Sequence, residues 1–213
     1  MHEREITMSE TKKRILYEAL RLFSKKGYDG VSMREIAQAV GIKGASIYNH
    51  FKGKEEIFEA IFEEMVAQYN EAAGHIGLPV QTGDATTAIF TKIGSETLFS
   101  MVDQLLQLFT QNEFVVSFRR LLISEQHKSA LAANYYKAYY LEAPIQFQSE
   151  IFAGLKAQGA FVDYDAQMLA LHFYSPIFLL LCRFDMGLPY EECKRLAEEH
   201  VSAFLQAYGS RSH

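Results

Sequence analysis

Cysteine is scarce in this chain of 213 residues, and the sequence signatures of enzymes are missing from it. Cys182 and Cys193 are the only two cysteines. We expect both to be reduced packing residues, with a redox pair as the alternative. The sequence contains no glycine-rich phosphate loop, no nucleophile elbow and no pair of metal ligands at a working spacing. These absences argue against an enzyme, so we predict no catalytic residues, no metal and no cofactor.

Segments that would target or anchor the chain are also lacking. The N-terminus, Met1–Glu5, has no apolar core of the kind found in a signal peptide. The most apolar stretch, residues 175–182, is too short to span a bilayer and is followed by Arg183. We therefore expect a cytoplasmic protein that does not bind a membrane.

Apolar residues, in contrast, are plentiful and recur at helical spacing. Hydrophobic residues make up 49% of the chain and charged residues 22%, which favours a folded, soluble protein over a disordered one. No alternating strand pattern, repeat or low-complexity tract interrupts the helical periodicity. The sequence predicts an all-α fold with a three-helix, helix-turn-helix head at residues 1–54. A long helix joins this head to a helical-bundle body for ligand binding and dimerisation at residues 55–213.

Charge is divided unevenly between the predicted head and body. Residues 1–54 contain 11 Lys and Arg and 6 Asp and Glu, a net charge of +5. Residues 55–213 contain 10 and 20, a net charge of −10, and the whole chain carries −5. A basic head on an acidic body is the asymmetry expected of a domain that faces phosphate groups.

Glycines and one capping box mark the helix boundaries of the head. Residues 10–26 form an amphipathic helix with one apolar stripe, and Gly27 ends it. Ser32 and Glu35 fit a capping box, which starts a short second helix that ends at Gly41. This helix and the next form a helix-turn-helix.

The second helix of that motif, residues 43–50, is the candidate for the major groove of DNA. Ile47 and Phe51 lie four positions apart and are expected to anchor it to the core of the head. Small and hydrogen-bonding residues then remain available on the outside. We predict DNA contacts from Ser32, Arg34, Lys43, Gly44, Ala45, Ser46, Tyr48, Asn49, His50 and Lys54.

Several predicted contacts have a chemical reason and a structural alternative. Tyr48 offers a hydroxyl to a phosphate and a ring to a thymine methyl, but it could be partly core. Lys54 begins the long helix, where free amides attract a phosphate. Ser32 is expected to cap its helix in either case, and His50 could merely end its own helix. The lysines of the first helix could form only a solvated face.

The stretch 11–62 resembles the N-terminal domain of the TetR family of transcriptional regulators. The matching segments are Ile15–Phe23, Gly27–Tyr28, Val31–Ala37, Val40–Ile42, Gly44–Tyr48 and His50–Lys54. Asn49 departs from the family, which commonly has an aromatic residue there, and an amide can read adenine. The resemblance implies a homodimer, a roughly palindromic operator and repression that an effector relieves.

The body is predicted to be helical beyond a loop at residues 74–83. We expect helices near residues 84–99, 101–111, 113–125, 128–157, 165–186 and 190–208. Pro144 and Pro176 lie inside helical patterns and are expected to kink them.

The last two predicted helices resemble the pair that forms a four-helix bundle across a TetR-type dimer. Their broad apolar surface would be a liability on a monomer. The predicted dimer interface consists of Leu169, Phe173, Ile177, Leu180, Leu181, Val201, Phe204, Leu205 and Tyr208. The alternative for roughly half of these residues is the core of the chain itself.

Aromatic residues are dense in the middle of the chain and favour a pocket between the body helices for a small apolar or aromatic effector. Its predicted lining is Phe114, Phe118, Tyr136, Tyr139, Tyr140, Phe147 and His172. A plain aromatic core is the alternative. The sequence thus predicts a ligand-responsive regulator whose partners are double-stranded operator DNA, a second copy of itself and a small molecule. The competing hypothesis is a helical dimeric interaction protein that does not read DNA.

Overall fold

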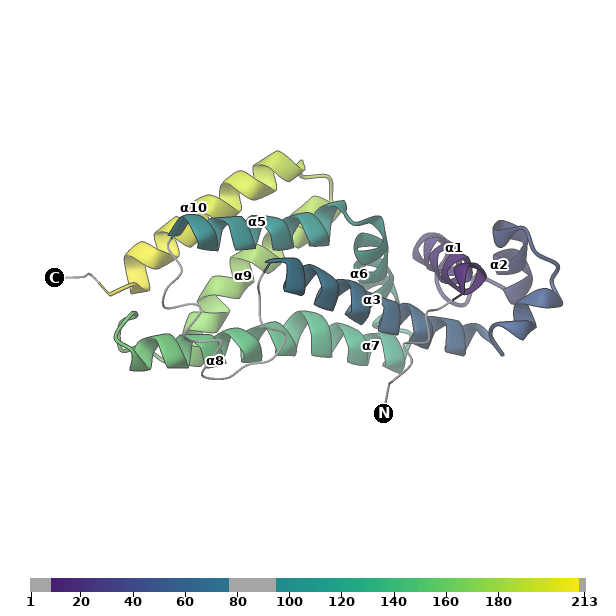
Figure 1. Cartoon of the computed structure of the whole chain (residues 1–213), viewed down its shortest axis with the longest axis horizontal. Coiled ribbons are helices and arrows are strands. Elements are labelled where there is room, and N and C mark those ends of the chain that lie inside the picture. Colours follow the sequence, from purple (N-terminus) through teal and green to yellow (C-terminus); the bar gives the residue numbers. More distant parts are fainter. Residues whose placement is uncertain (1–8, 77–94, 211–213) are drawn as a thin grey trace. The chain divides into compact units, whose positions relative to one another are not determined.

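A computed structural model of the chain describes residues 9–76 and 95–210, which are helical almost throughout (Figure 1). The elements are α1 (Glu10–Lys26), α2 (Met33–Val40), the 3-10 helix η1 (Ser46–Asn49), α3 (Lys54–Ile76), α5 (Ser95–Gln111), α6 (Glu113–Glu125), α7 (Ala130–Tyr136), the π-helix η2 (Lys137–Glu142), α8 (Ala143–Ala157), α9 (Ala166–Asp185) and α10 (Tyr190–Tyr208). Within these ranges, strand-like pairing is limited to an isolated bridge between Phe161 and Gly209. The predicted all-α fold is confirmed.

The chain divides into two compact units, each with its own core. Unit 1 takes in residues up to 68 together with 113–133, and so contains α1, α2, η1, most of α3, and α6. Unit 2 takes in residues 69–112 and 134 onward, and contains α5, η2, α8, α9 and α10. The boundary predicted at residue 54 coincides with the start of α3 and stays a prediction, while α6 packs on α1 within unit 1.

Helix α1 forms for the reasons that its sequence suggests. Ser9 precedes it, and its Oγ accepts a hydrogen bond from the Lys12 amide at 3.3 Å, which satisfies a backbone donor at the start of the helix. The apolar stripe is buried and consists of Ile15, Leu16, Ala19, Leu20 and Phe23. Gly27 follows the helix with φ +77°, a conformation that glycine adopts cheaply.

Several predicted helix boundaries are confirmed and others are wrong. The helices expected at 113–125 and 190–208 coincide with α6 and α10. No break separates residues 99 and 101, because α5 runs through both. Residues 74–76 are helical and belong to α3. The rest of the predicted loop, and residues 84–94 of the predicted helix, lie outside the described residues.

The helix predicted near 128–157 is helical without a break from Ala130 to Ala157, but its middle has π-helical geometry. Helix α7 passes into the π-helical turn η2, and α8 begins at Ala143. Pro144 closely follows this π-helical turn and has no amide to donate within the helix, and the carbonyl oxygen of Tyr140, four residues earlier, accepts from the Tyr174 hydroxyl at 2.9 Å. Pro176 lies inside α9, as predicted.

The core of unit 2 forms where α9 packs against α8 on one side and α10 on the other (Figure 1). One buried cluster joins all three helices through Ile151, Phe152, Leu155, Leu169, Ala170 and Phe204. A second joins α5, α9 and α10 through Leu106, Leu180, Leu181, Cys193 and Ala197. Cys182 and Cys193 form no disulfide, and burial raises the pKa of the Cys193 thiol.

Helix α9 is also long and apolar enough to cross a membrane by length and composition, a test that core helices of soluble proteins pass as well. One part of α9 is buried against α5, α8 and α10, and another part, including Leu171 and Leu179, is exposed.

Candidate DNA-binding site

The capping box predicted at Ser32 is present and fixes the start of α2. The Ser32 Oγ accepts from the Glu35 amide at 3.2 Å, and the Glu35 carboxylate accepts from the Ser32 amide at 2.8 Å. At the other end, Gly41 adopts the left-handed conformation with φ 78° and ψ 29°. Because that conformation strains other residues, Gly41 ends α2 and redirects the chain into the turn of the helix-turn-helix.

Basic side chains of α1 hold the helix-turn-helix in place. Arg14 Nη2 donates to the carbonyl oxygen of Val40 at 2.6 Å, which satisfies a free carbonyl at the end of α2. Lys26 Nζ lies 2.9 Å from Glu35 Oε1 and ties the end of α1 to the capping box. These two residues therefore have structural partners, which a helical wheel of α1 does not reveal.

The Glu35 contacts make the stability of the head depend on pH. The hydrogen bonds from Lys26 and Ser32 lower the pKa of the Glu35 carboxyl from 4.5 to about 2. A lowered carboxyl pKa means that the ionised form stabilises the fold, fully above about pH 4.5 and progressively less as the pH falls toward 2. Glu35→Gln is therefore expected to destabilise the protein at neutral pH, by an amount that shrinks across this interval.

Urea unfolding of both proteins between pH 7 and pH 2.5 measures this difference. The matched control is Glu63→Gln, which removes an exposed carboxylate of α3. A destabilisation by Glu35→Gln that stays constant with pH would contradict the role assigned to the Glu35 charge.

The short helix predicted at residues 43–50 to enter the major groove is a single 3-10 turn, η1, over Ser46–Asn49. The Ser46 amide donates to the Lys43 carbonyl at 2.8 Å, and the His50 amide donates to the Ile47 carbonyl at 3.0 Å. Both bonds span three residues, which is the 3-10 pattern. Ile47 is 0% exposed and Phe51 1%, so these two side chains anchor the segment as their spacing predicts.

The outer face of this segment presents small and hydrogen-bonding residues to solvent. The exposed members of the predicted contact set are Ser32, Arg34, Lys43, Gly44, Ala45, Tyr48 and Asn49. Tyr48 is 56% exposed, which is inconsistent with the core alternative. Ser46 and His50 are half-buried. The structure thus brings most of the predicted contact residues together on and beside one turn of chain.

Two residues of the predicted contact set have partners within the head. Lys54 Nζ donates to the Tyr28 carbonyl at 2.8 Å and lies 4.5 Å from the centroid of the Tyr28 ring. The Ser32 hydroxyl donates to Glu35 Oε2 at 2.9 Å. Lys54 therefore links the start of α3 to the loop before α2, a role that sequence reasoning missed because 26 residues separate the partners.

Residues 15–61 match the family described as bacterial regulatory proteins, tetR family. The matched segment covers α1 from Ile15 onward, the helix-turn-helix and the first turns of α3. The likeness of this chain to the TetR family therefore lies in this segment. The chain is 50% identical over 48 residues to IcaR of Staphylococcus aureus (strain Newman), a negative transcriptional regulator of a biofilm operon. The match covers 22% of this chain and 26% of IcaR, so the chain spans about a quarter of the curated relatives that it matches.

Solved structures extend the likeness to the whole fold. SmeT of Stenotrophomonas maltophilia, in complex with triclosan, superposes with a TM-score of 0.72 at 14% identity, over 96% of this chain and 94% of SmeT. A Saccharomonospora viridis protein in complex with choline gives a TM-score of 0.69 at 22% identity, over 96% of this chain and 100% of that protein. At these identities the likeness shows the TetR-type fold alone.

Some residues of the predicted dimer interface are buried within the chain, and the others are partly exposed. Five of its nine residues are buried within unit 2, namely Leu169, Leu180, Leu181, Val201 and Phe204. A side chain buried in its own chain has little surface left for a partner, so burial favours the core alternative for these five residues. The other four, Phe173, Ile177, Leu205 and Tyr208, are half-buried. The exposed apolar residues of α9 include Met168, Leu171 and Leu179, the last 58% exposed, and the sequence interpretation missed them.

The residues predicted to line the effector pocket are divided between the two units. Phe114 and Phe118 are buried in unit 1, where their rings pack against Tyr17 at 4.7 Å and Phe62 at 6.2 Å. For these two residues, burial in unit 1 favours the alternative of a plain aromatic core. The remaining five belong to unit 2.

Those five residues of unit 2 have different exposures and neighbours. Tyr140 is buried and stacks on Tyr136 at 5.9 Å, whereas Tyr139 is 45% exposed. Phe147 packs against the α8–α9–α10 core cluster. His172 Nδ1 lies 2.7 Å from the Tyr208 hydroxyl. The Tyr136–Tyr140 pair lies next to and within the π-helical turn η2, a feature often found at functional sites.

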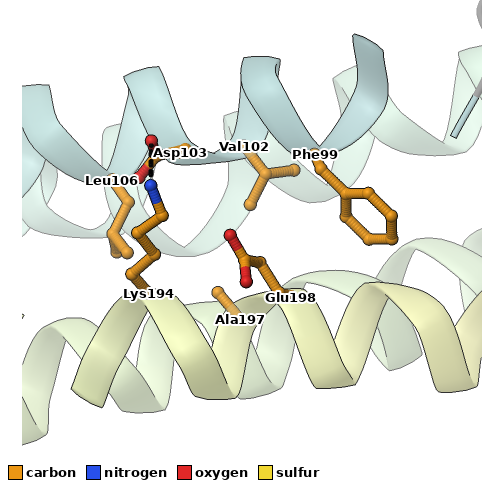
Figure 2. A pocket seen from close by; sticks show the side chains of 7 residues that line it. All are labelled: Phe99, Val102, Asp103, Leu106, Lys194, Ala197 and Glu198. Carbon is orange, nitrogen blue, oxygen red and sulfur yellow. Dashed lines mark hydrogen bonds and ion pairs between the residues drawn. The ribbon is translucent and has the colours of Figure 1, made fainter. Parts of the chain in front are cut away.

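A shallow depression between α5 and α10 has no room for a ligand (Figure 2). Lys194 of α10 reaches across to Asp103 of α5, with Nζ 2.9 Å from Oδ2, and the Tyr190 hydroxyl donates to Oδ1 at 2.5 Å. Burial raises the pKa of the Asp103 carboxyl, but the hydrogen bonds from Tyr190 and Lys194 outweigh it and lower that pKa overall. The depression is therefore an ion-paired helix contact.

Proposed function

We propose that this protein is a transcriptional regulator that binds a palindromic operator as a homodimer and responds to a small molecule. The main support for the proposal is that residues 43–50 form an exposed turn on a head with a net positive charge. Ile47 in this turn and Phe51 directly after it are buried. The small and hydrogen-bonding residues of the turn are thereby left facing solvent. The match to the TetR family supports a DNA-binding regulator over an enzyme.

The exposed residues suit distinct roles at DNA. Gly44 and Ala45 have little or no side chain, so the backbone can approach the bases closely. Lys43 and Arg34 supply positive charge for phosphates, which set affinity and position. Asn49 supplies an amide that can pair with adenine in the major groove, and Tyr48 supplies a hydroxyl for a phosphate.

Dimerisation is proposed through α9 and α10. The exposed residues Met168, Leu171 and Leu179 give α9 an outward apolar face, and the half-buried Phe173, Ile177, Leu205 and Tyr208 add to it. A twofold dimer presents two recognition segments, which fit successive major grooves when their centres are about 34–36 Å apart.

We propose that ligand binding changes the distance between the two recognition segments of the dimer. SmeT and the Saccharomonospora viridis protein, which share the fold, were solved with triclosan and with choline. Helix α3 begins in unit 1 and ends in unit 2. A small apolar or aromatic molecule that binds in the body and displaces α3 would therefore change the spacing of the heads and release the operator. Repression is the proposed sense of regulation, since IcaR is a negative regulator.

Binding of the purified protein to genomic fragments, including DNA that flanks its own gene, tests the proposal. We expect saturable binding to a palindromic site with a dissociation constant of about 10⁻⁸ M or tighter, which weakens steeply as salt increases. Weak binding that is indifferent to sequence would instead favour a helical dimeric interaction protein.

A further inference from the structure

Unit 1 contains a cavity of about 260 Å³ that is distinct from both predicted sites. Its lining combines two carboxylates with two aromatic rings, from Tyr28, Glu55, Phe58, Glu125, Ser129 and Leu131. These residues come from the loop before α2, the first turns of α3, the end of α6 and the start of α7. None of them belongs to the predicted DNA contacts or to the predicted effector pocket.

Glu125 is the most unusual of these residues because its carboxylate is buried. The residue is only 2% exposed, and Lys128 Nζ lies 3.5 Å from Glu125 Oε1 on a side chain that is 64% exposed. A Cβ at position 27 would lie only 3.0 Å from Glu125 Oε1. Gly27 therefore avoids a close contact with this carboxylate. A buried carboxylate is costly unless a positive group compensates it, and a mostly solvated ammonium at this distance compensates it weakly.

The aromatic half of the lining is preorganised. The Tyr28 and Phe58 rings meet edge to face, with centroids 5.5 Å apart and an interplanar angle of 86°. Burial raises the pKa of the Tyr28 hydroxyl, and the negative charges of Glu55, Asp29 and Glu59 raise it further. Lys54 Nζ already lies 4.5 Å from the centroid of the Tyr28 ring, so the carboxylates of Glu55 and Glu125 are the groups of the lining that favour a cation over an anion.

We propose that this cavity binds a small organic cation that carries an alkylammonium group. The Glu125 and Glu55 carboxylates would neutralise the charge, and the Tyr28 and Phe58 rings would pack against the alkyl substituents, as aromatic surfaces do around ammonium groups. The volume is just below the roughly 300–1,000 Å³ typical of ligand pockets, which suits a small molecule. A metal ion is disfavoured because, across residues 9–76 and 95–210, no group of three or more His, Cys, Asp or Glu is placed to hold one.

Tetramethylammonium chloride is the probe, titrated into the full-length protein at constant ionic strength and followed by amide chemical shifts. We expect saturable shifts confined to residues near 27–30, 55–58 and 125–131. The controls are sodium chloride, which supplies charge alone, and tert-butanol, which has a similar shape without charge. Shifts that do not saturate, or that either control reproduces, would overturn the proposal. The site lies outside the recognition segment, so this result does not depend on DNA binding.

Variants separate a cation site from a merely hydrated cavity. Glu125→Gln and Glu55→Gln are expected to weaken binding about tenfold or more and severalfold, respectively, because a neutral amide loses the ion pair. Lys128→Gln is expected to tighten binding, since it removes the internal cation that competes for Glu125. Glu113→Gln, an exposed change at the opposite end of α6, is the matched control and should leave binding unchanged.

The Glu125→Gln protein could fail to fold because Glu125 is buried. Glu55 and Lys128 are exposed, so substitutions there should leave the fold intact and still test the proposal. Affinity that is indifferent to both Glu55→Gln and Lys128→Gln would show that the carboxylates do not hold the cation, and the inference would fail.

Discussion

Lys43→Glu is expected to weaken operator binding by about a hundredfold at moderate salt, since the reversed charge loses one phosphate contact and repels the backbone. Lys43 is exposed and precedes η1, the turn of chain proposed to enter the major groove. The dependence of affinity on salt should also become shallower, by about one unit in the slope of log K against log[salt]. Fluorescence anisotropy with a labelled operator across several salt concentrations measures both quantities.

Lys137→Glu is the matched control for this prediction. Lys137 is an exposed lysine of unit 2, and its substitution changes the net charge of the protein by the same amount. Its effect on affinity should be small, and both variants should unfold at the temperature of the wild type. Equal losses of affinity in the two variants would mean that overall charge, and not the recognition segment, governs DNA binding.

Phe152→Ala is expected to lower the free energy of unfolding by about 3–5 kcal/mol, the usual cost of removing a buried phenyl ring. Phe152 is 6% exposed, and its ring lies 5.3 Å from that of Phe161, 5.8 Å from that of Phe173 and 5.4 Å from that of Phe204. One truncation therefore leaves a cavity where α8, α9 and α10 meet. Urea denaturation at a fixed protein concentration measures the loss, because the apparent stability of a dimer depends on concentration.

Val162→Ala is the comparison for this core variant. Val162 lies in the link between α8 and α9 and is 38% exposed, so its truncation should cost less than about 1 kcal/mol. A loss for Phe152→Ala no greater than that for Val162→Ala would contradict the assignment of the aromatic cluster as the core of unit 2.

The sequence predicts the head well because its boundaries depend on local chemistry. The capping box needs only Ser32 and Glu35, three residues apart, and the end of α2 needs only a glycine at position 41. The contacts that assemble the head are different. Arg14 to Val40 and Lys54 to Tyr28 each join residues 26 positions apart, and no periodicity marks such pairs.

The body is predicted less completely because an apolar pattern does not say which partner covers it. Leu169 and Leu179 are leucines of the same helix, yet the first is 0% exposed and the second 58%. The difference depends on where α8 and α10 lie, which no local pattern determines. Likewise, the density of aromatic residues between Phe114 and His172 suggests the lining of a single pocket. In the structure, Phe114 and Phe118 are buried in unit 1, and the other predicted pocket residues belong to unit 2.

A hydroxyl-radical footprint of the wild-type protein on its highest-affinity genomic fragment tests the central claim most directly. The account predicts two protected half-sites related by twofold sequence symmetry, with centres about one helical turn of DNA, roughly 10 base pairs, or a whole number of turns apart. Protection of a single site without symmetry, or uniform protection that does not depend on sequence, would contradict a homodimer that reads an operator through residues 43–50.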